Sequence, residues 1–116
     1  MKKILLVDDD EDNRSAMSDI LEFKGLSIVA SAKNGLEAVE QFSKYTPDVV
    51  LMDIMMPEYD GFYGIEHIKN IDPNTKIIAV TADQSVETQR KLKEMQQNLI
   101  IFKPFDIDTL VQMINE

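Results

Sequence analysis

Short apolar runs alternate with polar, helix-like stretches along the whole chain. The runs at Ile4–Val7 and Val49–Met52 are wholly apolar, which is the pattern of strands buried on both faces of a sheet. With three further runs, the predicted strands are Ile4–Val7, Leu26–Ser31, Val49–Met52, Lys76–Val80 and Leu99–Phe102. The run at Leu26–Ser31 is interrupted by serine and predicts a less buried strand.

Between these runs, apolar side chains recur three or four residues apart and predict helices. The first helix begins near Asp12 or Asn13, both good N-caps, and ends at Gly25. Its predicted apolar face comprises Ala16, Met17, Ile20, Leu21 and Phe23. The other predicted helices span about 35–45, 61–71, 85–97 and 106–114. The helix at 85–97 has a thin apolar face, formed by Val86, Leu92 and Met95.

The order of strand and helix repeats five times with short connections. Such alternation gives a parallel sheet with helices on both faces, joined by right-handed crossovers. We therefore expect an α/β fold, a doubly wound (βα)5 unit around a five-stranded parallel sheet. No linker or low-complexity segment interrupts the pattern, so residues 1–116 are expected to form one domain.

Polar side chains follow four of the predicted strands. Asp8 and Asp9 follow the first strand, Asp53 the third, Thr81 the fourth and Lys103 the fifth. The carboxyl ends of parallel strands lie at one edge of a sheet, where ligands of such folds bind. A lone aspartate after a strand more often caps the next element, but the convergence of these groups predicts a site.

The carboxylates of Asp8, Asp9 and Asp53 are predicted to crowd together. Two carboxylates about 5 Å apart repel each other by roughly 3 kcal/mol at an effective dielectric constant of about 20. A hard divalent cation relieves this repulsion, and oxygen ligands with open water positions suit Mg²⁺. We therefore predict a Mg²⁺ site that accepts a small oxyanion such as a phosphoryl group, held between the cation, Lys103 and Thr81.

Composition narrows the range of partners. The 116 residues carry a net charge of −9, which argues against a basic face for nucleic acid. Cysteine is absent, so disulfide and thiol chemistry are excluded. No apolar run is long enough for a membrane span or a signal peptide, so we expect a cytoplasmic protein without a membrane partner.

Four motifs together resemble the receiver domain of bacterial two-component response regulators. They are Ile4–Asp10, Asp53–Pro57 with Asp60-Gly61, Thr81-Ala82, and Lys103–Phe105, in the family's order and spacing. The resemblance covers essentially the whole chain, and it implies a flavodoxin-like fold and a function in phosphorelay signal transduction.

Position by position, the resemblance implies that Asp53 takes a phosphoryl group from a phosphohistidine of a sensor histidine kinase or phosphotransfer protein. The implied Mg²⁺ ligands are Asp8, Asp9, Asp53 and the backbone carbonyl of Met55. Lys103 would pair with the phosphoryl oxygens, and Thr81 would move toward them. A cis Lys103–Pro104 bond also belongs to the family pattern.

The resemblance further implies that phosphorylation changes the face built from residues 85–97, 99–102 and 106–114, and thereby its affinity for a downstream effector. The chain would catalyse its own phosphorylation and dephosphorylation without being a conventional turnover enzyme. Two departures concern this face. Ile100 stands where the family often has a switch Tyr or Phe, and Asn98-Leu99 replaces the acidic pattern of the largest DNA-binding subfamily. We therefore expect a monomer or weak dimer.

Four alternative functions are compatible with parts of the sequence. A calcium-binding loop starting at Asp8 would need glycine at position 13 and glutamate at position 19, but these residues are Asn13 and Asp19. A phosphatase of the haloacid dehalogenase type would need Gly-Thr after the strand-end Asp-x-Asp. A receiver-like binding module that is never phosphorylated would be favoured by departures at the site residues, and none is seen. The fourth alternative is that residues 1–116 are one domain of a longer regulator with a separate DNA-binding or enzymatic output domain.

Overall fold

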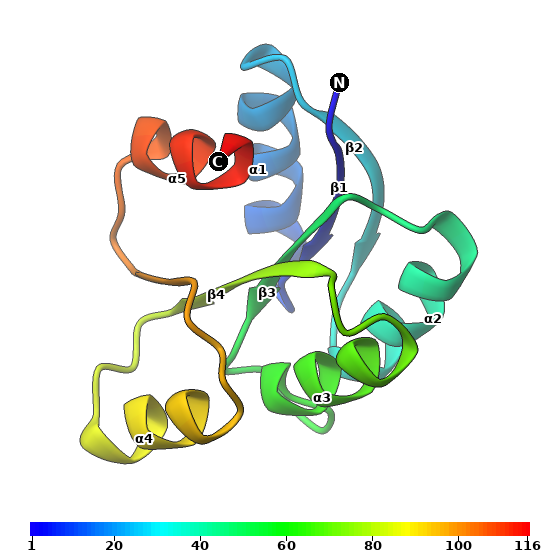
Figure 1. The fold of residues 1–116 in the computed structure, drawn as a ribbon. Coiled ribbons are helices and arrows are strands. Elements are labelled where there is room, and N and C mark those ends of the chain that lie inside the picture. The colour runs from blue at the N-terminus through cyan, green and yellow to red at the C-terminus, as the bar shows by residue number, and fades with distance from the viewer.

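Five strands alternate with five helices in the computed structural model, which describes residues 1–116 (Figure 1). The strands are β1 (Lys3–Val7), β2 (Ser27–Ala32), β3 (Val49–Asp53), β4 (Lys76–Thr81) and β5 (Ile100–Phe102). The helices are α1 (Glu11–Phe23), α2 (Gly35–Tyr45), α3 (Gly61–Ile71), α4 (Val86–Glu94) and α5 (Ile107–Asn115). All ten predicted elements are present, and the α/β architecture is confirmed.

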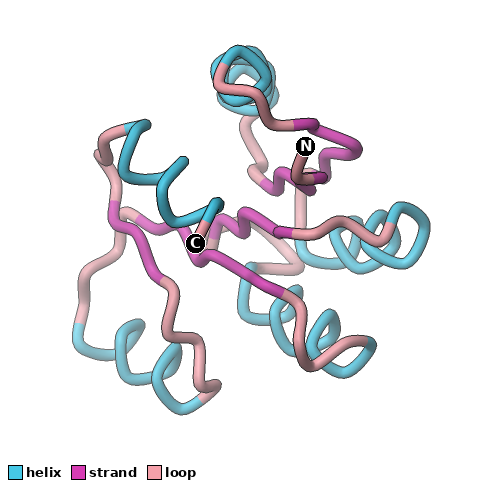
Figure 2. Tube along the Cα trace, turned by 45° about the horizontal axis from the view of Figure 1, so that its top comes forward, coloured by secondary structure: helices cyan, strands magenta, loops and turns pink.

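One parallel sheet in the order β2-β1-β3-β4-β5 separates two layers of helices (Figure 2). Helices α1 and α5 cover one face, whereas α2, α3 and α4 cover the other (Figure 1). Chain order reverses at β1 and β3, and this is the place where a ligand site is expected in a doubly wound fold.

Both faces of the central strands are buried, as the apolar runs predict. Along β1, Leu5 and Val7 pack into the core beneath α2 and α3, whereas Ile4 and Leu6 pack into the core beneath α1 and α5. Strand β3 alternates in the same way, and all five of its residues are buried. This alternation follows from the two-residue period of a strand. Strand β2 is only partly buried, as predicted.

Helix α1 begins earlier than predicted. Its N-cap is Asp10, whose side chain accepts hydrogen bonds from the backbone N–H groups of Asp12 and Asn13. The prediction of Asp12 or Asn13 as the cap was wrong because several adjacent residues are good caps and β1 leaves only three residues before the helix. The predicted burial of Phe23 was also wrong, since its side chain is 88% exposed. Two residues beyond the buried Leu21, Phe23 lies about 200° around the helix.

Helix α4 is shorter than predicted and buries a different face. Ser85 is its N-cap, and the helix ends at Glu94. Thr88 and Leu92, four residues apart, are buried, whereas Val86 is exposed. The predicted apolar face was therefore only partly right. Thr88, which carries a hydroxyl group, is buried on the face where the sequence pattern predicted Val86.

The last turn of α4 closes with two backbone hydrogen bonds, from Gln96 N to Lys93 O and from Gln97 N to Leu92 O. This is the pattern of a Schellman motif, which usually has glycine at the left-handed position. Here Gln96 adopts it, with φ at 60°. Gln97 is buried, and its Nε2 donates to the carbonyl oxygens of Ile77 and Leu99. These bonds fasten the end of α4 to the sheet.

Candidate functional site

The acidic residues meet because β1 and β3 are neighbours in the sheet. Val7 is paired with Met52, so the next residues, Asp8 and Asp53, leave the same edge side by side. Strand β4 lies on the other side of β3, where Asp53 is paired with Val80, and Thr81 follows. The parallel register thus brings the predicted residues to one edge.

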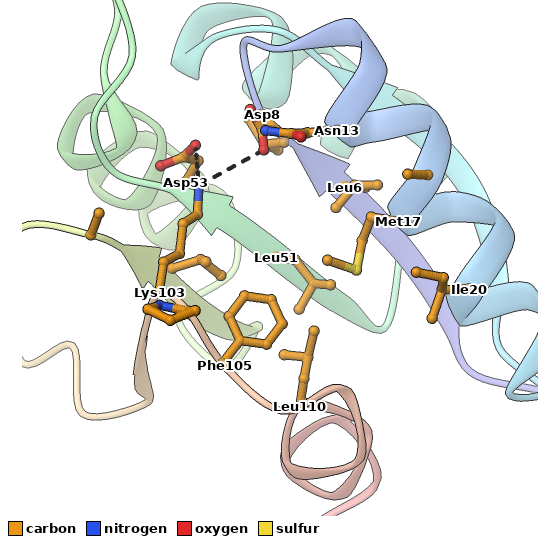
Figure 3. A pocket seen from close by; sticks show the side chains of 15 residues that line it. Leu6, Asp8, Asn13, Met17, Ile20, Leu51, Asp53, Lys103, Phe105 and Leu110 are labelled. Atoms are coloured by element: carbon orange, nitrogen blue, oxygen red, sulfur yellow. Dashed lines mark hydrogen bonds and ion pairs between the residues drawn. The ribbon is translucent and has the colours of Figure 1, made fainter.

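Asp53 is the most buried charged group at this edge, with 6% of its surface exposed. Lys103 extends toward it from the loop after β5, and its Nζ lies 3.2 Å from Asp53 Oδ2 (Figure 3). The same ammonium group lies 3.9 Å from Asp8 Oδ2. One cation is therefore shared by two carboxylates.

Asp8, Asp9 and Asp53 each offer a carboxylate oxygen, and these three oxygens lie within 4.8 Å of one another. Asp9 is exposed, so water molecules have access to complete a coordination shell. Hard oxygen donors with free coordination positions fit Mg²⁺, whose geometry is octahedral and retains several waters. The prediction that these carboxylates crowd together is confirmed.

Burial is the main cause of a raised pKa at Asp53, because desolvation penalises the charged carboxylate. Lys103 opposes this shift through its charge and its hydrogen bond, and the charge of Asp8 adds to it. The backbone N–H of Met55 also lowers the pKa of Asp53. The site therefore holds a carboxylate whose charge is costly without further compensation.

Thr81 ends β4 with a fully buried side chain. Its Oγ1 accepts a hydrogen bond from the backbone N–H of Asp83 at 3.0 Å, and its carbonyl oxygen accepts one from the N–H of Lys103 at 2.9 Å. Thr81 therefore connects the loop after β4 to the residue that contacts Asp53. The Lys103–Pro104 peptide bond is cis, as the resemblance implied.

Met55 lies in the exposed loop that follows β3. The far end of the loop is tied back to the residue that follows β3 by a hydrogen bond from Gly61 N to Ile54 O. A side chain at Gly61 would overlap the carbonyl oxygen of Asp53, so glycine is required by this close approach. The loop backbone is thereby fixed next to the carboxylates.

Two residues of the site were missed by the sequence predictions. Arg14 donates a hydrogen bond from Nη1 to the carbonyl oxygen of Asp8 at 2.6 Å, and Asn13 lines the cavity next to Asp8 (Figure 3). The signal for Arg14 was available, since it is the first cation after a run of acidic residues. Nothing in the sequence marked Asn13, which was interpreted as a helix cap.

A family model for the response regulator receiver domain matches residues 4–115. The chain belongs to the response regulator receiver family. CheY of Bacillus subtilis is 38% identical over 114 residues, which cover 98% of this chain and 95% of CheY. Receiver domains are components of two-component phosphorelay signalling, so this receiver has that general function.

Solved structures support the same assignment. A LuxR-family response regulator from Staphylococcus aureus superimposes with a TM-score of 0.91 at 28% identity, covering 99% of this chain and 97% of that chain. The CheX–CheY–BeF3–Mg²⁺ complex from Borrelia burgdorferi matches with a TM-score of 0.88 at 26% identity, covering 97% and 86%. The receiver has no helix that combines the length and apolarity required to cross a membrane.

Proposed function

We propose that Asp53 accepts a phosphoryl group from the phosphohistidine of a sensor histidine kinase or a phosphotransfer protein. The single observation that carries this proposal is the buried Asp53 carboxylate, held by Lys103 within a cluster of three aspartates. Residues 1–116 would form one receiver domain, and its location would be the cytoplasm.

In the transfer, a carboxylate oxygen of Asp53 forms a bond to phosphorus while the phosphorus–nitrogen bond of the donor breaks. The electron pair of that bond returns to the imidazole nitrogen, which is left as neutral histidine once it is protonated. The product is an acyl phosphate. Lys103 is placed to pair with the phosphoryl oxygens, because its ammonium already lies 3.2 Å from the acceptor.

Asp8, Asp9, Asp53 and the backbone carbonyl of Met55 are the groups that would hold Mg²⁺. When bound, the metal supplies positive charge that keeps Asp53 ionised and neutralises the transferred oxygens. The Borrelia burgdorferi complex contains Mg²⁺ together with BeF3, which supports a similar metal here. Arg14 would help by holding the backbone of Asp8 in place.

Hydrogen bonds connect Thr81 through Asp83 to the first turn of α4, and they support a route by which phosphorylation of Asp53 would be sensed. Asp83, whose N–H is bonded to Thr81, accepts from Ser85 N at 2.9 Å through Oδ1 and from Thr88 Oγ1 at 2.7 Å through Oδ2. When Thr81 turns toward the phosphoryl group, the Asp83 loop and the first turn of α4 would have to adjust. The face formed by α4, β5 and α5 would then change its affinity for a downstream effector.

The experiment is phosphorylation of the purified chain by acetyl phosphate, with and without Mg²⁺. We expect a phosphate that is released by hydroxylamine, formed only with Mg²⁺. Asp53→Asn should abolish it, whereas the exposed control Asp72→Asn should retain it. An unlabelled wild type, or undiminished labelling of Asp53→Asn, would contradict the proposal and favour a binding module that is never phosphorylated.

A further inference from the structure

A largely apolar cavity of about 490 Å³ opens beside the acidic cluster and extends between α1 and α5 (Figure 3). Met17 and Ile20 line it from α1, Leu51 from the sheet, and Phe105 and Leu110 from the opposite side. The proposed phosphoryl transfer takes place at its polar end and makes no use of the apolar part. The cavity therefore calls for a separate explanation.

The space exists because α1 buries only one side chain completely, Leu21. Ala16 and Ile20 are exposed, and Met17 is half-buried, although all three are apolar and line the cavity. Apolar walls of this size hold water poorly and favour an apolar occupant. The volume also lies within the range of small-molecule sites.

The polar end of the cavity is formed by Asp8, Asn13, Asp53 and Lys103. The single ammonium of Lys103 lies between the carboxylates of Asp8 and Asp53, and Asp9 offers a third carboxylate within 4.8 Å. Three carboxylates against one ammonium leave an excess of negative charge. The net charge of −9 on the chain acts in the same direction, so this end complements a cation.

We propose that the cavity binds a small amphiphilic amine. Its ammonium group, with three hydrogen-bond donors, lies at Asp8 and Asp53, and its alkyl or arylalkyl chain lies among Met17, Phe105 and Leu110. The ammonium group and Mg²⁺ need the same carboxylates, so the two ligands exclude each other. Such an amine would keep the receiver unphosphorylated, a consequence that rests on the proposed function, whereas the binding itself does not.

The test is a titration of the full chain with n-octylamine at pH 7 in EDTA, followed by calorimetry and by the NMR signal of the Met17 methyl group. Four additional buried methylenes should make octylamine bind up to about 200-fold more tightly than n-butylamine. Octanoate and 1-octanol should bind at least about tenfold more weakly than octylamine. Mg²⁺ added in excess of the EDTA should weaken octylamine binding in proportion to the free Mg²⁺ concentration.

Two variants on α1 locate the site. Ala16→Phe places a ring at the cavity wall and should abolish the Met17 shift, whereas Ser15→Phe makes the same change at an exposed neighbour outside the cavity. Equal binding of 1-octanol and octylamine, no competition by Mg²⁺, or equal losses in the two variants would each overturn the proposal. Because no phosphodonor is present, failure of phosphorylation would leave these measurements unaffected.

Discussion

Replacing Asp53 by asparagine should stabilise the metal-free protein at neutral pH. The substitution retains the shape of the side chain and removes a charge that is almost completely buried. Asp8 and Asp9 would lose a close negative neighbour, and Lys103 would still have Asp8 at 3.9 Å. We therefore expect the ionised carboxylate of Asp53, the proposed phosphoryl acceptor, to lower the free energy of unfolding of the metal-free protein.

The magnitude follows from four contributions, of which only the attraction to Lys103 favours the charged carboxylate. At an effective dielectric constant of about 20, Lys103 at 3.2 Å attracts Asp53 by about 5 kcal/mol, and Asp8, within 4.8 Å, repels it by about 3 kcal/mol. Repulsion from the exposed Asp9 reduces the remaining attraction further. Desolvation of a buried carboxylate costs several kcal/mol, so the balance favours asparagine by about 1–2 kcal/mol.

The assay is urea denaturation of both proteins in EDTA between pH 3 and pH 8. Because the folded-state pKa of Asp53 is raised, its protonated form contributes stability below the ordinary value of 3.8. That contribution is lost as the pH rises from 3.8 through the folded-state pKa, so the advantage of asparagine should grow over that range and be complete above it. In saturating Mg²⁺ the order should reverse, since the wild type binds the metal more tightly.

A less stable Asp53→Asn protein at pH 7 in EDTA would refute this reasoning. So would a difference that persists at pH 3, where both side chains are neutral. Equal stabilisation of the two proteins by Mg²⁺ would show that Asp53 is not a ligand of the metal.

Three further substitutions test local features by the midpoint of urea denaturation. Gln96→Gly should stabilise by about 0.5–1 kcal/mol, because glycine adopts the left-handed conformation without strain; no gain would contradict the Schellman assignment. Asp10→Ala should cost about 1 kcal/mol and Asp12→Ala much less, since Asp10 is the N-cap; equal costs would contradict that cap. Gly61→Ala should cost about 1–3 kcal/mol because its methyl group meets backbone, whereas Gly64→Ala meets the flexible end of a methionine; the reverse order would be inconsistent with this packing.

The parallel sheet and the site edge were predictable because they depend on strong, repeated signals. Val49–Met52 is apolar throughout, and a strand buried on both faces belongs to a parallel sheet. Once the sheet is parallel, Asp8, Asp53 and Lys103 must emerge at one edge. Their convergence follows from topology and does not depend on the detail of any helix.

Helix ends and helix faces were less predictable because several residues compete for the same role. Asp10, Asp12 and Asn13 are all good caps, and only the length of the preceding loop selects Asp10. Gln97 looks like a surface residue in the sequence, but it is buried and its amide donates to two carbonyl oxygens. The cavity could not be predicted from the sequence either, because its volume depends on the distance between α1 and α5.

Ile100 stands where the receiver family often has a switch Tyr or Phe, and its packing shows what this departure changes. It packs into the core on the side of α2, α3 and α4, whereas Ile101 packs on the opposite side. A half-buried aliphatic side chain at this position has no hydroxyl or ring to report a change at Asp53. The hydrogen bonds from Thr81 through Asp83 to Thr88 need no such aromatic, and Thr88 is one of only two buried residues of α4. We therefore infer that the first turn of α4 can respond to Thr81 without an aromatic side chain at position 100.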